Sequence, residues 1–206
     1  MFVAPAGKRY QAVDILPERY GDGWQFRMGV PAECDWQRLV RGIVEVVLLE
    51  LANRNTRTTV AQAPLWLSEG LSGLIIAEHG RTLVTEPNAF LVVAGRKLER
   101  LRQARELFRD GEPSTFTELS LPDPQKLGEP VAWSRYQAAA QLFTQEILND
   151  GDGRQRLGAF LQILPQNLNW QTAFLRAFNP HFLTLMRSEE HTSELQSHLN
   201  LVCRLL

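Results

Sequence analysis

The sequence predicts an α+β, mostly helical domain in which a short N-terminal β element precedes a helical body. The first 31 residues combine aromatic and β-branched residues with Pro and Gly turn signals, and Trp24–Met28 is the clearest alternating stretch. Apolar residues at helical spacing then recur over most of the remaining chain. With 206 residues, of which 44% are hydrophobic, the chain is long enough to form one domain with a substantial core.

The first two expected helices follow the β element directly. Asp35 is a candidate N-cap for a helix over Trp36–Asn53, whose many apolar residues predict burial on most sides. The polar run Arg54–Thr59 predicts a loop. Pro64 opens a second helix, which ends near Gly80.

The second half of the chain should be helical apart from its first part. We expect short extended segments at 82–85 and 90–93, a charged helix over Gly95–Phe108 and a long surface loop over Asp110–Pro130, which is rich in Pro, Gly and Ser. The helices expected after this loop are Trp133–Asn149, Arg154–Leu164 and Trp170–Phe178.

The second helix carries the most informative motif, the run WLSEGLS over residues 66–72. This run resembles the third-ligand helix of gluzincin metallopeptidases, in the subset called peptidase-MA-like, where a W-L-x-E-G-L-[AS] stretch supplies the glutamate that completes a zinc site. The residues that match are Trp66, Leu67, Glu69, Gly70, Leu71 and Ser72. The resemblance implies a truncated zincin-like fold over residues 24–186, and it is specific only over 64–73.

Members of that family carry H-E-x-x-H on the preceding helix. The apolar run there and the 24-residue step from Glu45 to Glu69 align the motif with Arg41-Gly42-Ile43-Val44-Glu45. Arg41 and Glu45 then take the histidine positions, and Gly42 takes that of the general-base glutamate. No histidine lies between Met1 and Glu78, so a shifted register does not restore the motif.

These replacements remove the chemistry that a zinc peptidase needs. Such a site requires two neutral imidazoles at i and i+4, a carboxylate ligand, and a second carboxylate that takes a proton from metal-bound water. Arg41 carries a permanent positive charge, which repels a dication, and Gly42 has no side chain. The resemblance therefore implies a catalytically inactive pseudo-metallopeptidase domain without a cofactor, with a structural or interaction role. In it Trp66, Leu67, Gly70 and Leu71 serve packing.

A buried lone charge is costly, so the arginine at position 41 needs a partner. We expect its guanidinium to take the place of the zinc and to bridge Glu45 and Glu69. Two simpler interpretations remain open at this point. Arg41 and Glu45 can form a plain i,i+4 pair, and Glu69 can be a surface carboxylate near a helix start.

Two other functions also remain open. One is an active zinc metallopeptidase or hydrolase whose ligands include groups such as His79 or His181, with zinc as cofactor. The other is an unrelated helical interaction domain that shares the WLSEGL string by chance. Cys34 has no nearby base in the sequence and is interpreted as a structural thiol.

Residues 187–206 are interpreted as an artefactual tail. Arg187–Ser197 (RSEEHTSELQS) reads back into codons as a short-read sequencing adapter, and Leu201–Leu206 (LVCRLL) fits its continuation in the same frame. We therefore expect one peptidase-MA-like domain over 1–186, truncated at the C-terminus and with an N-terminus that could also be cut. The tail itself should be loosely packed.

Charge and cysteine content say little about partners or compartment once the tail is set aside. Two of the 22 basic and three of the 23 acidic residues fall in the tail, so the rest of the chain is neutral and gives no argument for nucleic acid. No signal peptide is visible, and no segment approaches the roughly 18 apolar residues of a transmembrane helix. A bacterial envelope or secreted location follows from the family resemblance alone. The partner stays unknown, with a protein partner or further domains open.

Overall fold

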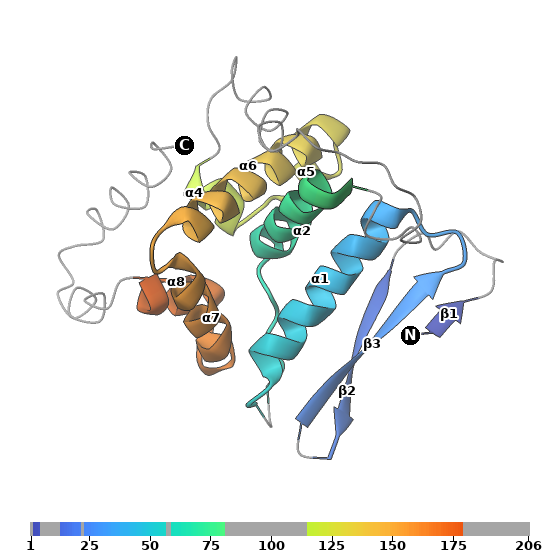
Figure 1. The fold of residues 1–206 in the computed structure, drawn as a ribbon, viewed down its shortest axis with the longest axis horizontal. Helices are drawn as coiled ribbons and strands as arrows, with labels where there is room; N and C mark the ends of the chain where they lie inside the picture. The colour runs from blue at the N-terminus through green and yellow to red at the C-terminus, as the bar shows by residue number, and fades with distance from the viewer. Residues whose placement is uncertain (1, 5–12, 22, 57–58, 81–114, 179–206) are drawn as a thin grey trace.

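The computed structural model describes residues 2–4, 13–21, 23–56, 59–80 and 115–178, and within them the fold is α+β and mostly helical (Figure 1). This confirms the predicted fold class. The segments expected at 82–85, 90–93 and 95–108, His181 and the tail 187–206 lie outside the described residues.

The N-terminal element is a small sheet with strand order β1-β3-β2. Strand β2 (Asp14–Tyr20) pairs antiparallel with β3 (Gly23–Pro31), and β1 (Phe2–Ala4) pairs parallel with β3. Gly21 follows β2 with φ of 56°, a left-handed conformation that glycine adopts without strain. The described part of the first 31 residues therefore contains strands, as the sequence predicted.

The helical body begins with α1 (Trp36–Asn53) and α2 (Leu65–His79), whose bounds agree with the sequence prediction. The later helices are α4 (Phe116–Ser120), α5 (Pro124–Leu127), α6 (Pro130–Asn149), α7 (Gly153–Ile163), the 3₁₀ turn η2 (Leu164–Gln166) and α8 (Trp170–Phe178). The expected long surface loop at 110–130 is wrong over its described part. Thr115 and Glu118 cap α4 reciprocally, and Phe116 is buried, so local capping outweighs the loop-like composition.

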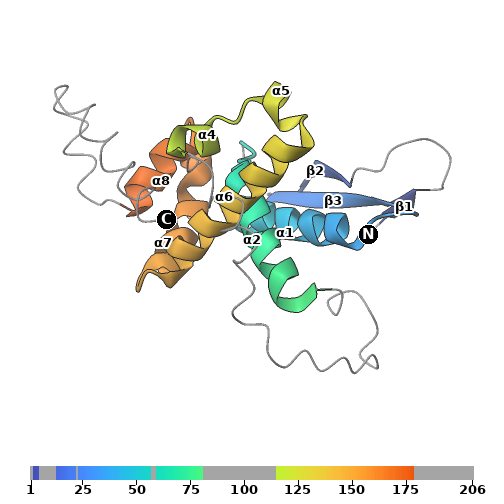
Figure 2. The ribbon, with the colours of Figure 1, turned by 90° about the horizontal axis from the view of Figure 1, so that it is seen from above.

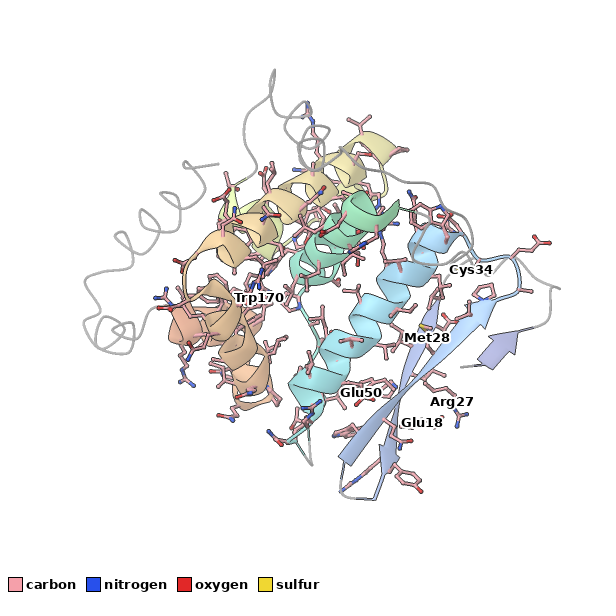
Figure 3. The ribbon with its side chains drawn as sticks, viewed as in Figure 1. Glu18, Arg27, Met28, Cys34, Glu50 and Trp170 are labelled. Atoms are coloured by element: carbon pink, nitrogen blue, oxygen red, sulfur yellow. The ribbon has the colours of Figure 1, made fainter. Side chains whose placement is uncertain are left out.

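The elements are arranged side by side, with α1 against the sheet, α2 against α1, and α6 against α2 (Figure 1). Seen from above, the sheet lies at one end of the molecule and α7 and α8 at the other (Figure 2). Met28 and Glu50 lie between the sheet and α1 (Figure 3), and the Phe26 backbone N–H donates to Glu50 Oε1 at 3.3 Å.

An aromatic cluster centred on Trp66 forms the core of the helical body. Trp66 is fully buried, and its ring centroid lies 4.9 Å from that of Phe143 on α6 and 5.9 Å from that of Phe174 on α8. Phe160 and Trp170 complete the contacts around it. The first residue of the WLSEGLS motif is therefore the point at which α2, α6, α7 and α8 meet.

One expectation about α1 is wrong. Its apolar sequence predicted burial on most sides, yet Ile43, Val47 and Leu51 are 45%, 51% and 39% exposed. The sheet covers one side of α1, and α2 and α7 cover another. No described element covers the stripe between them.

Candidate functional site

Helices α1 and α2 bring Arg41 and Glu69 together. Arg41 Nε lies 3.1 Å from Glu69 Oε2, with the arginine side chain 30% exposed and the glutamate side chain 10% exposed. The Nε–H does not point at an acceptor among the described residues, so the contact is an ion pair without a well-aligned hydrogen bond. The interpretation of Glu69 as a surface carboxylate is therefore wrong, because its carboxylate is buried and paired.

A third helix supplies a second partner for the same carboxylate. Gln137 on α6 donates from Nε2 to Glu69 Oε2 at 2.7 Å. Sequence reasoning missed Gln137, because nothing in its local sequence connects it with a helix 68 residues away. The buried carboxylate of Glu69 thus has its charge balanced by α1 and its oxygen hydrogen-bonded from α6.

Glu45 does not take the predicted part in this cluster. Among the described residues no ion pair joins Arg41 and Glu45, so the plain i,i+4 pair does not form. Of the expected bridge from Arg41 to Glu45 and Glu69, only the contact with Glu69 is present. The Glu45 side chain is exposed at the surface. Its pKa is raised by partial burial of the carboxyl and, secondly, by the negative charge of Glu69. Position 45 therefore lies within electrostatic reach of Glu69.

The neighbouring tyrosine responds to the same charge. Burial, and then the negative charge of Glu69, raise the pKa of Tyr136 well above its usual range. Its hydroxyl donates to the backbone oxygen of Leu119 at 3.3 Å. Tyr136 is therefore a neutral group that ties α6 to α4.

Gly42, which aligns with the general base, faces the sheet. A Cβ placed there would lie 2.7 Å from Val13 Cγ1 and 3.3 Å from Met28 Sδ. The first of these contacts is shorter than real Cβ contacts, so any side chain at position 42 requires the side chains of Val13 and Met28 to shift. The side chains of Val13 and Met28 fill the space in which the first carbon of a base at this position would lie.

The packing residues of the motif occupy distinct environments. Trp66 and Leu67 are fully buried, and Leu71 lines an apolar groove. Gly70 lies against α6, where an added Cβ would meet Thr144 Oγ1 and, at 2.5 Å, the backbone oxygen of Ala140. The glycine of the motif therefore permits the close approach of α2 and α6.

No group of three or more His, Cys, Asp or Glu side chains within the described residues could hold a metal ion. His79 is the last residue of α2, ten positions after Glu69, which places it roughly 15 Å further along the helix axis. Two side chains that far apart on one helix do not ligate the same ion. Cys34 is a free thiol whose pKa is raised by burial and by Asp35.

In comparisons with known proteins, no family model, curated protein or solved structure matches the chain. Across the described part of the chain, no helix combines the length and the apolar content needed to cross a membrane.

Proposed function

We propose that this chain is a catalytically inactive peptidase-MA-like domain with a structural or interaction role. The observation that carries the proposal is the Arg41–Glu69 ion pair. It joins the two positions at which the resemblance places a histidine ligand and the glutamate ligand of a zinc site.

The ion pair supports this function because it satisfies the glutamate without a metal. A buried carboxylate needs a cation and hydrogen-bond donors close by. Here the Arg41 guanidinium supplies the charge at 3.1 Å and Gln137 supplies a donor at 2.7 Å. The arginine thus provides the compensation that a zinc ion would otherwise give, and it docks α1 against α2.

Gly42 gives independent support. A zinc peptidase needs a carboxylate that takes a proton from metal-bound water. At position 42 even a methyl group would press on Val13 and Met28. A glutamate there would therefore require the Val13 and Met28 side chains to rearrange, whatever occupies positions 41 and 45.

The direct test is metal analysis of the purified chain together with a peptidase assay, each with and without a chelator. We expect no stoichiometric zinc and no chelator-sensitive cleavage. Chelator-sensitive cleavage that Glu69→Gln abolishes would establish the rival function, an active zinc metallopeptidase.

A gain-of-function variant tests whether the helices keep the family geometry. Arg41→His combined with Glu45→His creates two imidazoles at i and i+4 opposite the Glu69 carboxylate, which is a complete set of protein zinc ligands. We expect this double variant to bind one zinc ion in calorimetry and to remain without peptidase activity, because Gly42 supplies no base.

The matched control adds Glu69→Gln to the double variant and should lose most of the zinc affinity. If the double variant binds no zinc while keeping its fold, positions 41, 45 and 69 do not have the geometry of a zinc site. That result would favour the third interpretation, an unrelated helical interaction domain.

A further inference from the structure

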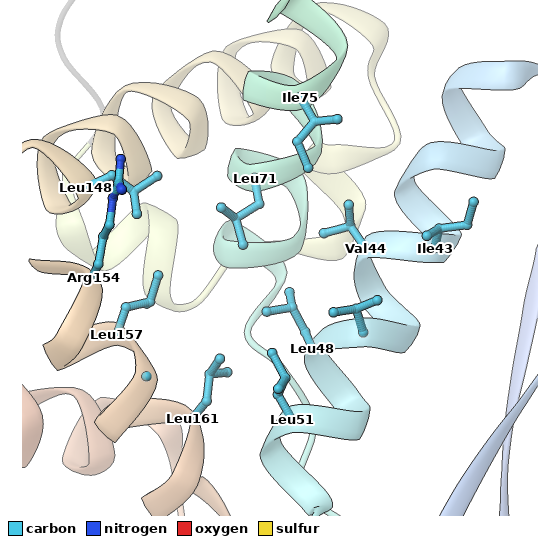
Figure 4. Close-up of a pocket in the computed structure, with 12 residues that line it drawn as sticks. Ile43, Val44, Leu48, Leu51, Leu71, Ile75, Leu148, Arg154, Leu157 and Leu161 are labelled. Carbon is cyan, nitrogen blue, oxygen red and sulfur yellow. The ribbon is translucent and has the colours of Figure 1, made fainter. Parts of the chain in front are cut away.

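An apolar groove of about 450 Å³ lies on the face of the molecule between α1, α2 and α7 (Figure 4). Leu71 and Ile75 of α2 lie between the two walls, which are formed by α1 and α7. The groove takes in Ile43 and Val44, but it does not include Arg41, Glu45 or Glu69. It is therefore distinct from the ion-paired site.

The wall formed by α1 is open to solvent. Ile43, Val47 and Leu51 are 45%, 51% and 39% exposed and follow one another at intervals of four residues. At 1.5 Å per residue this stripe is roughly 12 Å long, about two helical turns. Aligned exposed apolar residues of this kind mark interaction surfaces, whereas single ones are normal on any protein.

The opposite wall has an opening at Gly158 of α7. A Cβ added at Gly158 would meet nothing within 4 Å, so the space above it is empty. Leu157 and Leu161 stand on either side of it along α7. The wall therefore leaves room for one side chain from outside.

Of the described residues that line the groove, one is charged, Arg154 in the first turn of α7. Its neighbour Arg156 is held by Asp150 at 3.3 Å and by Asp152 at 3.6 Å. Among the described residues no ion pair is formed by Arg154, and its side chain is exposed. The rim of the groove thus offers a positive charge to an incoming group.

We propose that this groove binds an amphipathic α-helix of a partner protein, which places apolar side chains at i, i+4 and i+7 in the groove and an acidic side chain against Arg154. The inference rests on the interaction role in the proposed function and names the kind of partner. A helix fits because the groove is bounded by helices and is two turns long, which is the geometry of helix-in-groove recognition. The acidic side chain follows from charge complementarity with Arg154.

The test uses the full chain and a synthetic helix-forming peptide with Leu at i, i+4 and i+7 and Glu beside the first Leu. A second peptide has the three Leu replaced by Ala. Fluorescence anisotropy should show saturable binding of the Leu peptide and none of the Ala peptide. Gly158→Leu fills the opening in the α7 wall and should weaken binding at least about tenfold, because the groove no longer admits the apolar face.

Gly158→Leu should not disturb the fold, because the added side chain enters open space and leucine favours a helix over glycine. Thermal unfolding checks this, and Val47→Glu on the exposed wall is the substitute variant if it fails. Arg154→Glu should weaken binding about fivefold, and a peptide with Lys in place of its Glu should restore it.

Three results would overturn the proposal. The first is no binding of the Leu peptide to the wild-type chain, as expected if the chain itself fills the groove. The second is binding that neither Gly158→Leu nor Val47→Glu reduces. The third is a wild-type dimer in sedimentation that Val47→Glu dissociates, since the occupant would then be a second copy. The zinc measurements do not depend on the groove, so failure here is distinguishable from failure of the proposed function.

Discussion

Replacement of Gly70 by alanine should destabilise the protein, although alanine is the better helix former. Gly70 lies in α2 where this helix crosses α6. A methyl group at position 70 would meet Thr144 Oγ1, the backbone oxygen of Ala140 at 2.5 Å and Thr144 Cβ at 2.9 Å. The threonine side chain can rotate, but a backbone oxygen inside α6 moves only with its helix. The two helices therefore have to separate to accept the methyl group.

The expected size follows from two opposing terms. Overpacking of a well-packed contact costs typically about 1–3 kcal/mol, and the immobile backbone contact places Gly70→Ala in the upper part of that range. The greater helix propensity of alanine offsets about 1 kcal/mol. We expect the free energy of unfolding to fall by about 2 kcal/mol or less. For a chain of this size, a loss of about 2 kcal/mol lowers Tm by roughly 4–8 °C.

The assay is urea and thermal unfolding of Gly70→Ala beside Gly158→Ala. The second variant makes the same chemical change in α7, where an added Cβ meets open space, so it should be neutral or stabilising by up to about 1 kcal/mol. Adding Thr144→Ala to Gly70→Ala should recover part of the loss, because it removes the contact with Thr144 Oγ1, whereas the contacts with the β-carbon of residue 144 and with Ala140 O remain. If the two glycine variants unfold alike, the close α2–α6 contact does not determine the effect and the reasoning is refuted.

The remaining predictions concern polar groups. Glu69→Gln should cost about 1–2 kcal/mol in urea unfolding, because Arg41 loses its partner but is 30% exposed and partly hydrated; an unchanged midpoint would contradict this. Because the pKa of Glu45 is raised in the folded state, the wild type loses stability as pH rises from the ordinary carboxyl pKa of 4.5 to the higher folded-state pKa. Glu45→Gln should therefore gain stability relative to the wild type over that rise in pH, and a constant difference would exclude the raised pKa. Asn53→Ala should cost about 2–3 kcal/mol by chemical unfolding, because Asn53 donates to Ala61 O at 2.9 Å and accepts from Ala61 N at 2.7 Å; a loss below about 0.5 kcal/mol would show that water replaces both bonds.

The bounds of α1 and α2 could be predicted because their signals are local. Asp35 and Pro64 stand in extended conformations directly before α1 and α2, although the Asp35 side chain makes no cap hydrogen bond, and Gly80 ends α2 at φ of 55°. The same kind of local signal precedes α4, where Thr115 and Glu118 form a capping box. This pairing favours a helix, whereas the Pro, Gly and Ser content of the segment predicts a loop.

Of the two contacts that Glu69 makes in the site, one could be predicted from the sequence and the other could not. The family resemblance predicted that Arg41 lies opposite Glu69, and the structure has this ion pair. It did not predict Gln137, because that contact depends on how α6 crosses α2, and the crossing is set by Gly70. Nor could apolar periodicity predict that Val47 stays exposed, because burial of a helix face depends on which other elements reach it.

The contacts among Arg41, Glu69 and Gln137 bear on how α1, α2 and α6 align, as well as on the stability of the fold. Apolar residues of similar volume often stabilise a core as well as an ion pair does. Helix α2 is apolar on nearly all sides, so apolar packing alone could be satisfied in neighbouring registers of α1 and α6. A buried carboxylate has one satisfactory register, in which an arginine and an amide both reach it. We therefore expect Glu69 to favour one register of α1 and α6 against α2, the register in which the Arg41 ion pair and the Gln137 hydrogen bond both form.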